Sequence, residues 1–350
     1  MSNDEGRSGR LRAWFYFVIR ISFDIRHSCF VIAQVKLIEV PAADFDLAMT
    51  LNSGQVFHWE KVDAGFCGTI GDRAVYVEQR GDVLQIKMEG GALRRHRQNR
   101  VFRKVPRSTI ATTAGLRKLA PPSAARVVAH YFALDHPLEE ICASFPQDSV
   151  MNAARDFCRG LRIIRQPKWE CLATFICSSM KQVAHIRQIS RTLRQRFGKR
   201  KEICGWEVFA FPSPEPLART TESKLRKCGL GYRAKNLLAT AKSVASGQVD
   251  LDSWSPLSDR KLRERLCELP GIGMKVANCV MLFAYERIAA FPIDVWIERV
   301  LREKYFVRNR KVTGQMLADF VANYFGAHGG YAQQYLFHHA RMMGRRREKG

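Results

Sequence analysis

The sequence predicts an α+β protein in which an N-terminal antiparallel β-sheet is followed by a helical region. Between about residues 34 and 107, runs that alternate between apolar and polar residues, such as AVYVEQ and VLQIKM, are separated by Gly-Asp pairs at 71–72 and 81–82. Short alternating runs joined by such pairs are typical of β-hairpins. Beyond Pro121 and Pro122 the apolar residues recur at helical spacing, as in AARVVAHYFAL and GQMLADFVANYF.

These changes of pattern divide the chain into three parts. We expect a leader over residues 1–35, a sheet domain over 36–120 and an all-helical domain over 121–345. The leader mixes apolar and basic residues, without helix caps and without the small-residue cleavage site of a secretory signal. We assign it no function.

Composition points to a nucleic-acid partner. The 350 residues carry a formal net charge of +24 and 46% of them are hydrophobic, so we expect a folded protein with a polyanionic partner. Nucleic acid is favoured over an anionic membrane surface. The most apolar stretch, LRAWFYFVIRISFDIRHSCFVIA, is interrupted by charged residues, so we expect no transmembrane anchor. The ten cysteines form no CxxC pair, which argues against a metal site and favours reduced thiols in an intracellular protein.

Three basic segments, residues 94–107, 191–201 and 341–350, lie on different predicted elements. The first, RRHRQNRVFRKVPR, is either a solvated strand or an edge that faces phosphates. Together the three segments could line a groove for a nucleic-acid strand.

The stretch LPGIGMKVANC, residues 269–279, predicts a tight turn between two helices. Gly271 and Gly273 lack Cβ, so their backbone N–H groups can approach a phosphate at the positive end of the second helix. A helix hairpin that only packs is the alternative. Lys275 lies in the first turn, where the helix dipole disfavours a protonated amine, so it is a candidate nucleophile. Cys279 follows four residues later on the same face.

A second motif follows the hairpin. In AAFPIDVWIERVL, a proline and then Asp294 precede another apolar helix. Asp294 is either the N-cap of that helix or a functional carboxylate. The hairpin and this FPIDVW motif together resemble the helix–hairpin–helix plus Gly/Pro…Asp signature of the base-excision DNA glycosylase superfamily.

Further segments narrow the resemblance to the 8-oxoguanine DNA glycosylase/lyase family. They are FDLAMTLNSGQVFHW, HYFALDHPLEEI, RQPKWECLATFICSS, GLGYRAKNL and AQQYLF. They occur in the family's order and cover roughly residues 36–345. Lys275 is the discriminating residue, because purely hydrolytic members of the superfamily lack an amine at that point.

The resemblance implies a bifunctional DNA glycosylase/AP lyase that flips 8-oxoguanine, or another oxidised purine, out of double-stranded DNA. Lys275 would attack C1′ of the deoxyribose as the base leaves, giving a Schiff base that permits β-elimination. Asp294 would stabilise the positive charge that develops on the sugar. We expect no metal and no cofactor. We also expect a monomer, located with DNA in a bacterial cytoplasm or nucleoid, or in a nucleus or mitochondrion.

The matching positions also imply a pocket for the flipped base. The carbonyl of Gly54 would accept a hydrogen bond from N7 of 8-oxoguanine, whereas N7 of guanine carries no hydrogen to donate. Cys279 and Phe337 would sandwich the purine ring, and Gln333 would read its Watson–Crick edge. Because Gln333 and Phe337 are four residues apart, both can point into one pocket from one helix.

On the DNA side, the resemblance implies that Tyr232 wedges into the base stack and that Arg233 faces the base left opposite the lesion. Two positions that contact the opposite strand depart from the family's pattern. Met180 stands where relatives usually carry an asparagine, and His185 stands where they often carry an arginine. We therefore expect a weaker preference for cytosine opposite the lesion.

Two more departures occur together. Trp296 replaces a histidine that commonly follows the aspartate by two residues, and Ala340 replaces that histidine's usual acidic partner. This suggests that a polar pair helping to hold the lesion's phosphate has been exchanged. Two alternatives to an 8-oxoguanine enzyme are an alkylpurine or adenine glycosylase with the same hairpin, and a non-catalytic DNA-binding protein.

Overall fold

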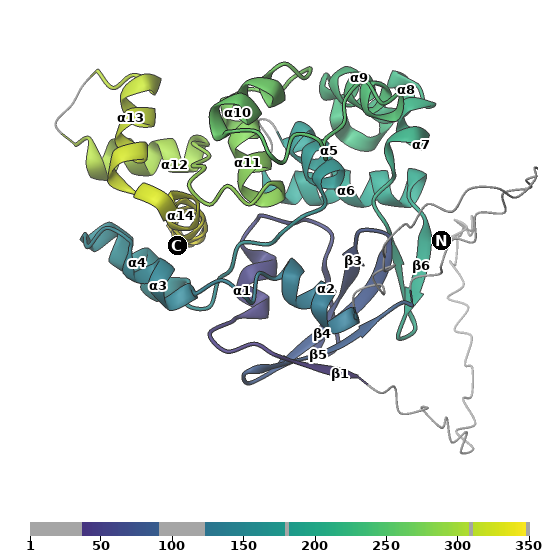
Figure 1. The fold of residues 1–350 in the computed structure, drawn as a ribbon, viewed down its shortest axis with the longest axis horizontal. Helices are drawn as coiled ribbons and strands as arrows, with labels where there is room; N and C mark the ends of the chain where they lie inside the picture. Colours follow the sequence, from purple (N-terminus) through teal and green to yellow (C-terminus); the bar gives the residue numbers. More distant parts are fainter. Residues whose placement is uncertain (1–36, 91–122, 179–181, 308–310, 348–350) are drawn as a thin grey trace, which may run out of the picture. The chain divides into compact units, whose positions relative to one another are not determined.

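The residues described by the computed structural model (Figure 1) are 37–90, 123–178, 182–307 and 311–347. All of them belong to one unit of the chain, Lys36–Gly350. Met180, the leader predicted over 1–35 and the basic segment 94–107 lie outside the described residues. The domain boundary predicted at residue 120 also lies outside them and stays a prediction.

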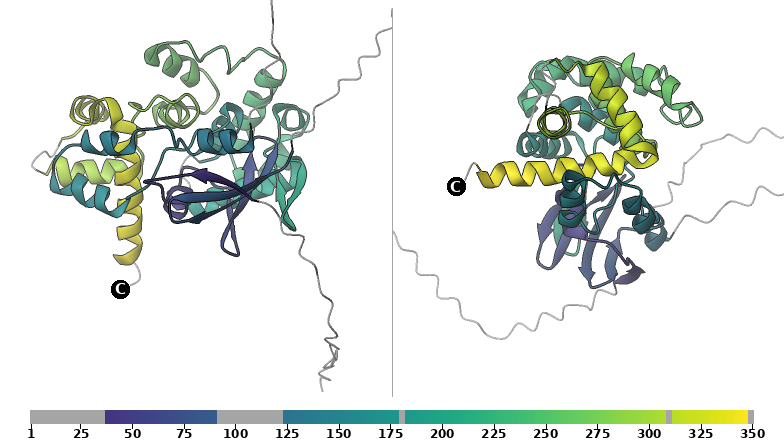
Figure 2. Two further views of the ribbon diagram at one scale, coloured as in Figure 1. Left: turned by 60° about the horizontal axis from the view of Figure 1, so that its bottom comes forward. Right: turned by 90° about the vertical axis from the view of Figure 1, so that its left-hand side faces the viewer.

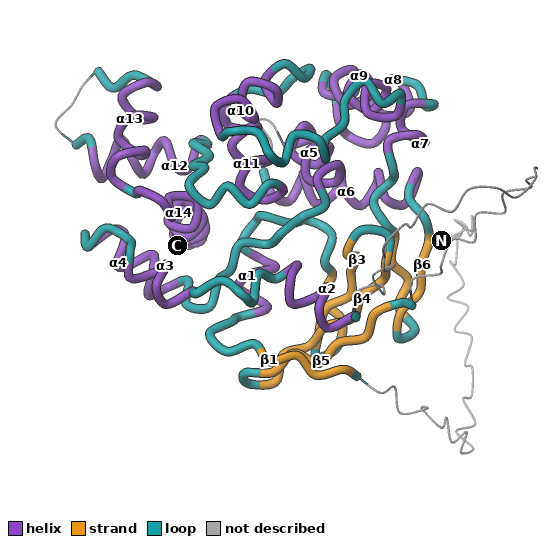
Figure 3. The backbone as a smooth tube through the Cα atoms, in the orientation of Figure 1, coloured by secondary structure: helices purple, strands orange, loops and turns teal. Residues whose placement is uncertain are grey.

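The N-terminal strands form an antiparallel sheet with the order β1-β5-β4-β3-β2 (Figure 3). The strands are β1 (Ile38–Pro41), β2 (Glu60–Val62), β3 (Gly65–Ile70), β4 (Arg73–Arg80) and β5 (Val83–Met88). Gly71 and Gly81 hold the first positions of the two-residue turns that join β3 to β4 and β4 to β5, with φ values of 61° and 56°. A positive φ at this position is what type II′ hairpin turns need, so the predicted turns are confirmed.

The second region is mostly rather than wholly helical. A hairpin of β6 (Arg200–Ile203) and β7 (Trp206–Phe209) interrupts it and packs beside β4 and β3 of the sheet. Its turn is formed by Cys204 and Gly205, with φ values of 52° and 79°. The sequence does not predict this hairpin, because cysteine is an unusual residue for the left-handed conformation.

The helices follow the strands in the order seen in Figure 1. Their bounds are α1 (Leu47–Asn52), α2 (Ala124–Tyr131), α3 (Leu138–Ala143), α4 (Ser149–Phe157), α5 (Lys168–Ser178), α6 (Val183–Phe197), α7 (Pro214–Ala218), α8 (Glu222–Leu225), α9 (Arg233–Ala245), α10 (Asp259–Cys267), α11 (Met274–Ala284), α12 (Val295–Val300), α13 (Gly314–Tyr324) and α14 (Gly329–Arg347). Figure 2 shows α14 running along the border between the sheet and the other helices. Among the residues described, no helix combines the length and apolar character needed to cross a membrane.

Helix α1 lies inside the region predicted to be strands. The side chain of Asp46 accepts a hydrogen bond from the backbone N–H of Met49 at 2.7 Å, which caps the helix at its N-terminus. This cap explains why a six-residue helix forms between two strands. The loop that follows α1 carries Gly54.

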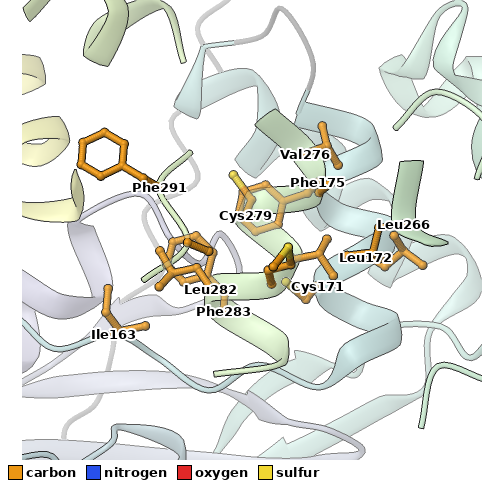
Figure 4. Close-up of a cluster of buried hydrophobic side chains, with 14 of the residues drawn as sticks. Ile163, Cys171, Leu172, Phe175, Leu266, Val276, Cys279, Leu282, Phe283 and Phe291 are labelled. Carbon is orange, nitrogen blue, oxygen red and sulfur yellow. The ribbon is translucent and has the colours of Figure 1, made fainter. Parts of the chain in front are cut away.

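Helix α5 forms the centre of the helical core. Every residue from Glu170 to Ser178 is buried, and the helix packs against α6, α9 and α11. Figure 4 shows its side chains Cys171, Leu172 and Phe175 among those of α11 and its neighbours. Because α5 is enclosed on all sides, it fixes the positions of the helices that carry the candidate site.

A buried ionic cluster joins the sheet to this helical core. Arg194 on α6 pairs with the carboxylate of Glu170 and donates from Nη1 to the Thr69 hydroxyl at 2.9 Å. His58 lies 3.4 Å from the same carboxylate, and burial followed by the charge of Arg194 holds the pKa of His58 well below its usual value. Arg194 belongs to the basic segment 191–201, so this part of the segment is structural and not available to a nucleic-acid groove.

Gln55 ties the loop after α1 to the segment that precedes α5. Its Nε2 donates to the carbonyl oxygen of Arg162 at 2.8 Å, and its Oε1 accepts from the N–H of Ile164 at 2.7 Å. Its own carbonyl accepts from Nε2 of Gln166 at 2.8 Å, and the backbone N–H of Gln166 donates to the carbonyl of Phe283 at 2.7 Å. Gln55 is fully buried and, together with Gln166, connects the Gly54 loop to the end of α11.

We predict that Gln55→Leu lowers the free energy of unfolding by about 2–4 kcal/mol, because buried backbone groups lose their hydrogen-bond partners. Chemical denaturation followed by circular dichroism measures this change. Gln188→Leu, at an exposed position on α6, is the control and should change stability by less than about 0.5 kcal/mol. Equal stability of the two variants would contradict the structural role of Gln55.

Candidate active site

A cavity of about 170 Å³ lies where the Gly54 loop, α5, α6, α11, the start of α12 and α14 meet. Its lining residues are Gly54, Phe57, Phe175, Ser178, Gln182, Val183, Ile186, Lys275, Cys279, Phe283, Pro292, Asp294, Trp296, Gln333, Gln334, Phe337 and Arg341. The structure thus brings together the two residues expected to be catalytic and the four expected to hold the base. These six come from four separate parts of the sequence.

The helix–hairpin–helix forms as its sequence predicts. Helix α10 ends at Cys267 and α11 starts at Met274, with Gly273 in the N-cap position. Gly271 has a φ of 78°, and a Cβ there would lie 2.1 Å from Nδ2 of Asn236 on α9, so only glycine fits. A Cβ at Gly273 would meet open space, and both glycines are exposed. The backbone at the positive end of α11 is therefore accessible to a phosphate.

Lys275 enters the cavity from the first turn of α11. Its Nζ lies 3.4 Å from Oγ of Ser178 and 5.5 Å from the centre of the Phe175 ring. The Ser178 hydroxyl donates to the backbone carbonyl of Phe175 at 2.8 Å, so its oxygen is left to accept from the lysine. The amine therefore donates to the neutral Ser178 hydroxyl beside an aromatic face.

Asp294 serves as the N-cap of α12 and also lines the cavity. Its Oδ1 accepts a hydrogen bond from the N–H of Ile297 at 2.9 Å. Burial raises the pKa of Asp294 above its usual range, while the Ile297 N–H and the charge of Lys275 act in the opposite direction. Asp294 therefore caps α12 and also places a carboxyl group in the cavity, so the two interpretations of its role from the sequence are compatible.

Aromatic side chains and a thiol form one side of the cavity. Phe175 and Phe283 stack with ring centres 5.5 Å apart and planes inclined by 8°. Burial raises the pKa of the Cys279 thiol to about 11, although the charge of Lys275 opposes this shift. The thiol is therefore protonated at neutral pH and presents a neutral surface.

Helix α14 supplies the polar side of the cavity. Oε1 of Gln333 is buried and has no hydrogen-bond partner among the described residues. Nε2 of Gln334 donates to the carbonyl of Ser53 at 3.1 Å, which anchors the helix to the loop that carries Gly54. Gln333 is thus an amide placed in the cavity wall with an acceptor still to be satisfied.

Three other predicted residues lie outside this lining. Tyr232 is 52% exposed immediately before α9, as a residue that enters a base stack must be. Arg233 is buried, its guanidinium 4.3 Å from the centre of the Tyr232 ring and its Nη1 donating to the carbonyl of Leu230 at 3.3 Å. It would have to leave this position to face an opposite base. His185 is exposed in the first turn of α6.

The sequence does not predict several of the lining residues, among them Phe57, Phe175 and Arg341. The two phenylalanines gave no signal, because apolar residues that line a cavity have the same periodicity as those in a core. Arg341 could have been found, since it continues the spacing of four from Gln333 to Phe337.

The two residues that replace the polar pair lie beside a second, largely apolar cavity. Trp296 and Ala340 line this cavity together with Gly344, and a Cβ on Gly344 would lie 2.7 Å from the Trp296 ring. The guanidinium of Arg299 lies 5.5 Å from the centre of that ring. The tryptophan thus packs against α14 at a glycine that leaves room for it.

The chain is similar to known DNA repair enzymes along most of its length. Residues 37–172 match the family of the 8-oxoguanine DNA glycosylase N-terminal domain, and residues 173–322 match the HhH-GPD superfamily of base excision DNA repair proteins. The N-glycosylase/DNA lyase OGG1 of Arabidopsis thaliana is 30% identical over 308 residues, and the match covers 84% of this chain and 77% of the Arabidopsis protein. The probable N-glycosylase/DNA lyase of Methanothermobacter thermautotrophicus is 28% identical over 327 residues, and the match covers 87% of this chain and 96% of the relative.

Solved structures agree with these sequence matches. The Clostridium acetobutylicum 8-oxoguanine glycosylase/lyase, in complex with double-stranded DNA containing cytosine opposite 8-oxoguanine, superposes with a TM-score of 0.72 at 26% identity, covering 88% of this chain and 98% of that one. The chain thus combines the helix hairpin, Lys275, Asp294 and the cavity with a match to the 8-oxoguanine DNA glycosylase N-terminal domain and a match to the HhH-GPD superfamily. The chain therefore belongs to the 8-oxoguanine DNA glycosylase family and is an N-glycosylase/DNA lyase.

Proposed function

We propose that the protein excises 8-oxoguanine from double-stranded DNA with Lys275 as the nucleophile, and that it then cleaves the strand by β-elimination. The observation that carries this proposal is that Lys275 and Asp294 line the same cavity. The other side chains that line it include apolar groups and the amide of Gln333. Such a site suits a planar purine with polar edges. A base within a stacked duplex cannot reach groups inside a cavity, so the target nucleotide must be flipped into it.

The same cavity provides the recognition of the base. Cys279 and Phe337 contact the faces of the purine, and Gln333 forms hydrogen bonds with its Watson–Crick edge. The carbonyl of Gly54 accepts from the hydrogen on N7 of the lesion. Guanine would place an acceptor against this carbonyl, and a buried mismatch of this kind costs about 1–3 kcal/mol.

In the reaction, the lone pair of Nζ of Lys275 forms a bond to C1′ and the base leaves with the electrons of the glycosidic bond. The proton that Nζ then gives up passes to the departing base. The carboxylate of Asp294 stabilises the positive charge on the sugar in the transition state. Ring opening gives a Schiff base between Nζ and C1′. Loss of a proton from C2′ then expels the 3′ phosphate.

The DNA duplex is held by electrostatic attraction and by the hairpin. The formal net charge of +24 favours a polyanion, and the exposed backbone at Gly271 and Gly273 fits one phosphate of the strand. Tyr232 fills the gap that the flipped base leaves. We expect the protein to act on duplex DNA as a monomer, in a compartment that contains DNA.

We predict that Lys275→Gln reduces the single-turnover rate of 8-oxoguanine excision by about a thousandfold or more, because the nucleophile is lost. Affinity for the lesion duplex should fall by less than about tenfold, since one positive charge is removed. Lys235→Gln, at an exposed position on α9, removes the same charge and is the control. Excision by Lys275→Gln at the rate of this control would show that another group is the nucleophile.

We predict that Asp294→Asn lowers the excision rate by about a hundredfold or more while leaving the melting temperature unchanged or higher. Burial raises the pKa of Asp294, so its contribution to stability is lost as the pH rises through that pKa, and the ionised form costs stability at neutral pH. Asparagine removes the charge and caps a helix equally well. Differential scanning calorimetry and single-turnover assays test both parts, and a marked drop in melting temperature would point to a purely structural residue.

We also predict a relaxed preference for the base opposite the lesion. Met180 and His185 lack the donors and acceptors of the asparagine and arginine found in relatives, so a wrong opposite base leaves fewer groups unpaired. Excision opposite adenine, guanine or thymine should therefore be less suppressed than in those relatives, with cytosine still preferred. Single-turnover rates for the four opposite bases measure this, and the double variant Met180→Asn, His185→Arg should steepen the preference. A preference already as steep as in the relatives would refute it.

A further inference from the structure

Arg341 is a buried cation in the wall of the cavity, and the chemistry proposed above gives it no task. Its side chain is on the face of α14 that carries Gln333 and Phe337, each four residues apart. Only 5% of the residue is exposed. Burial of a guanidinium is costly, so its position inside a ligand cavity calls for a function.

The guanidinium is held in a fixed orientation. Its Nη2 donates to the backbone carbonyl of Asn52 at 2.6 Å and lies 3.0 Å from Nδ1 of His338. Burial, and then the charge of Arg341, lower the pKa of His338 to about 4, so the imidazole is neutral and its Nδ1 accepts. The guanidinium carbon lies 5.6 Å from the centre of the Phe337 ring. These contacts place the donor before a substrate arrives.

The other terminal nitrogen, Nη1, lies beside Gly54. A Cβ on Gly54 would be 3.6 Å from Nη1 and 3.0 Å from Cε1 of Phe337. Gly54 has a φ of 92°, a conformation that strongly favours glycine. Gly54, Phe337 and Nη1 of Arg341 therefore enclose one corner of the cavity.

This corner is where the atoms that distinguish the lesion would lie. If the carbonyl of Gly54 accepts from N7, the oxygen on the adjacent carbon, O8, is within the same corner. O8 is a hydrogen-bond acceptor, whereas guanine has only a C–H group at that position. We propose that Arg341 is a specificity-determining residue whose Nη1 donates a hydrogen bond to O8 of the flipped 8-oxoguanine.

This proposal rests on the proposed function and adds to it a second means of reading the lesion. Gly54 tests whether N7 carries hydrogen, and Arg341 tests whether C8 carries oxygen. A hydrogen bond from a charged donor to a buried acceptor is stronger than a neutral one, so the second test contributes to affinity as well as to discrimination.

The experiment compares duplexes that contain 8-oxoguanine or 8-thioguanine. The thio base keeps the hydrogen on N7 and replaces O8 by sulfur, a weak acceptor. Affinities are measured in the Lys275→Gln background, so that no base is released. Arg341→Met should reduce the preference for oxygen over sulfur by about tenfold, as expected for a hydrogen bond to a charged group. Arg341→Lys keeps the charge but has a single nitrogen, already needed by Asn52, so its preference should fall by about threefold or more.

A matched control is available in Arg187 on α6, whose Nη2 donates to the side-chain Oδ1 of Asn52 at 3.1 Å but which does not line the cavity. Arg187→Met should lower affinity for both duplexes and leave the preference between them unchanged. Thermal unfolding of each variant is measured first, and if Arg341→Met does not fold, Arg341→Lys carries the test.

An unchanged oxygen preference in the folded Arg341 variants would overturn the proposal, as would an equal change in Arg187→Met, because either result assigns Arg341 only to holding the loop at Asn52. The proposed function fails separately. It is contradicted if the unmodified enzyme does not excise 8-oxoguanine at all, whatever the Arg341 variants bind.

Discussion

The cavity depends on the hydrogen bonds of one buried carboxamide, that of Gln55. It joins the loop of Gly54 to the segment before α5, and Gln166 continues the connection to Phe283 at the end of α11. Lys275 stands at the other end of the same helix. Because a helix transmits position along its length, these bonds set the distance between the group proposed to recognise the lesion and the group proposed to attack it.

Helix α14 also holds the Gly54 loop in place through hydrogen bonds. Gln334 donates to the backbone carbonyl of Ser53 in the Gly54 loop, and Arg341 donates to that of Asn52 at the end of α1. The cavity that these hydrogen bonds enclose contains groups whose burial costs stability. One of them is the carboxyl group of Asp294, whose pKa is raised by burial. A site of this kind gives up some stability in exchange for reactivity.

The sequence predicts the parts of this arrangement that local chemistry determines. Gly71 and Gly81 mark the hairpin turns, and Gly271 marks the helix hairpin, because each needs a backbone conformation that few residues adopt. Local chemistry also makes Lys275 and Asp294 candidates for a functional role, and the resemblance adds the four predicted pocket residues, Gly54, Cys279, Gln333 and Phe337. Features that depend on tertiary contacts could not be predicted from the sequence. The turn at Cys204 lacks the usual residues, Arg194 is buried although its segment is basic, and Arg233 lies against Tyr232 rather than in solvent.

The central claim is that Lys275 attacks C1′ from within the cavity. Incubation of the enzyme with an 8-oxoguanine duplex in the presence of borohydride would reduce the Schiff base to a stable bond, and peptide mapping by mass spectrometry would locate the attached deoxyribose. The account predicts a covalent adduct on the peptide that contains Lys275. No adduct during active excision, or an adduct on a different amine, would contradict it.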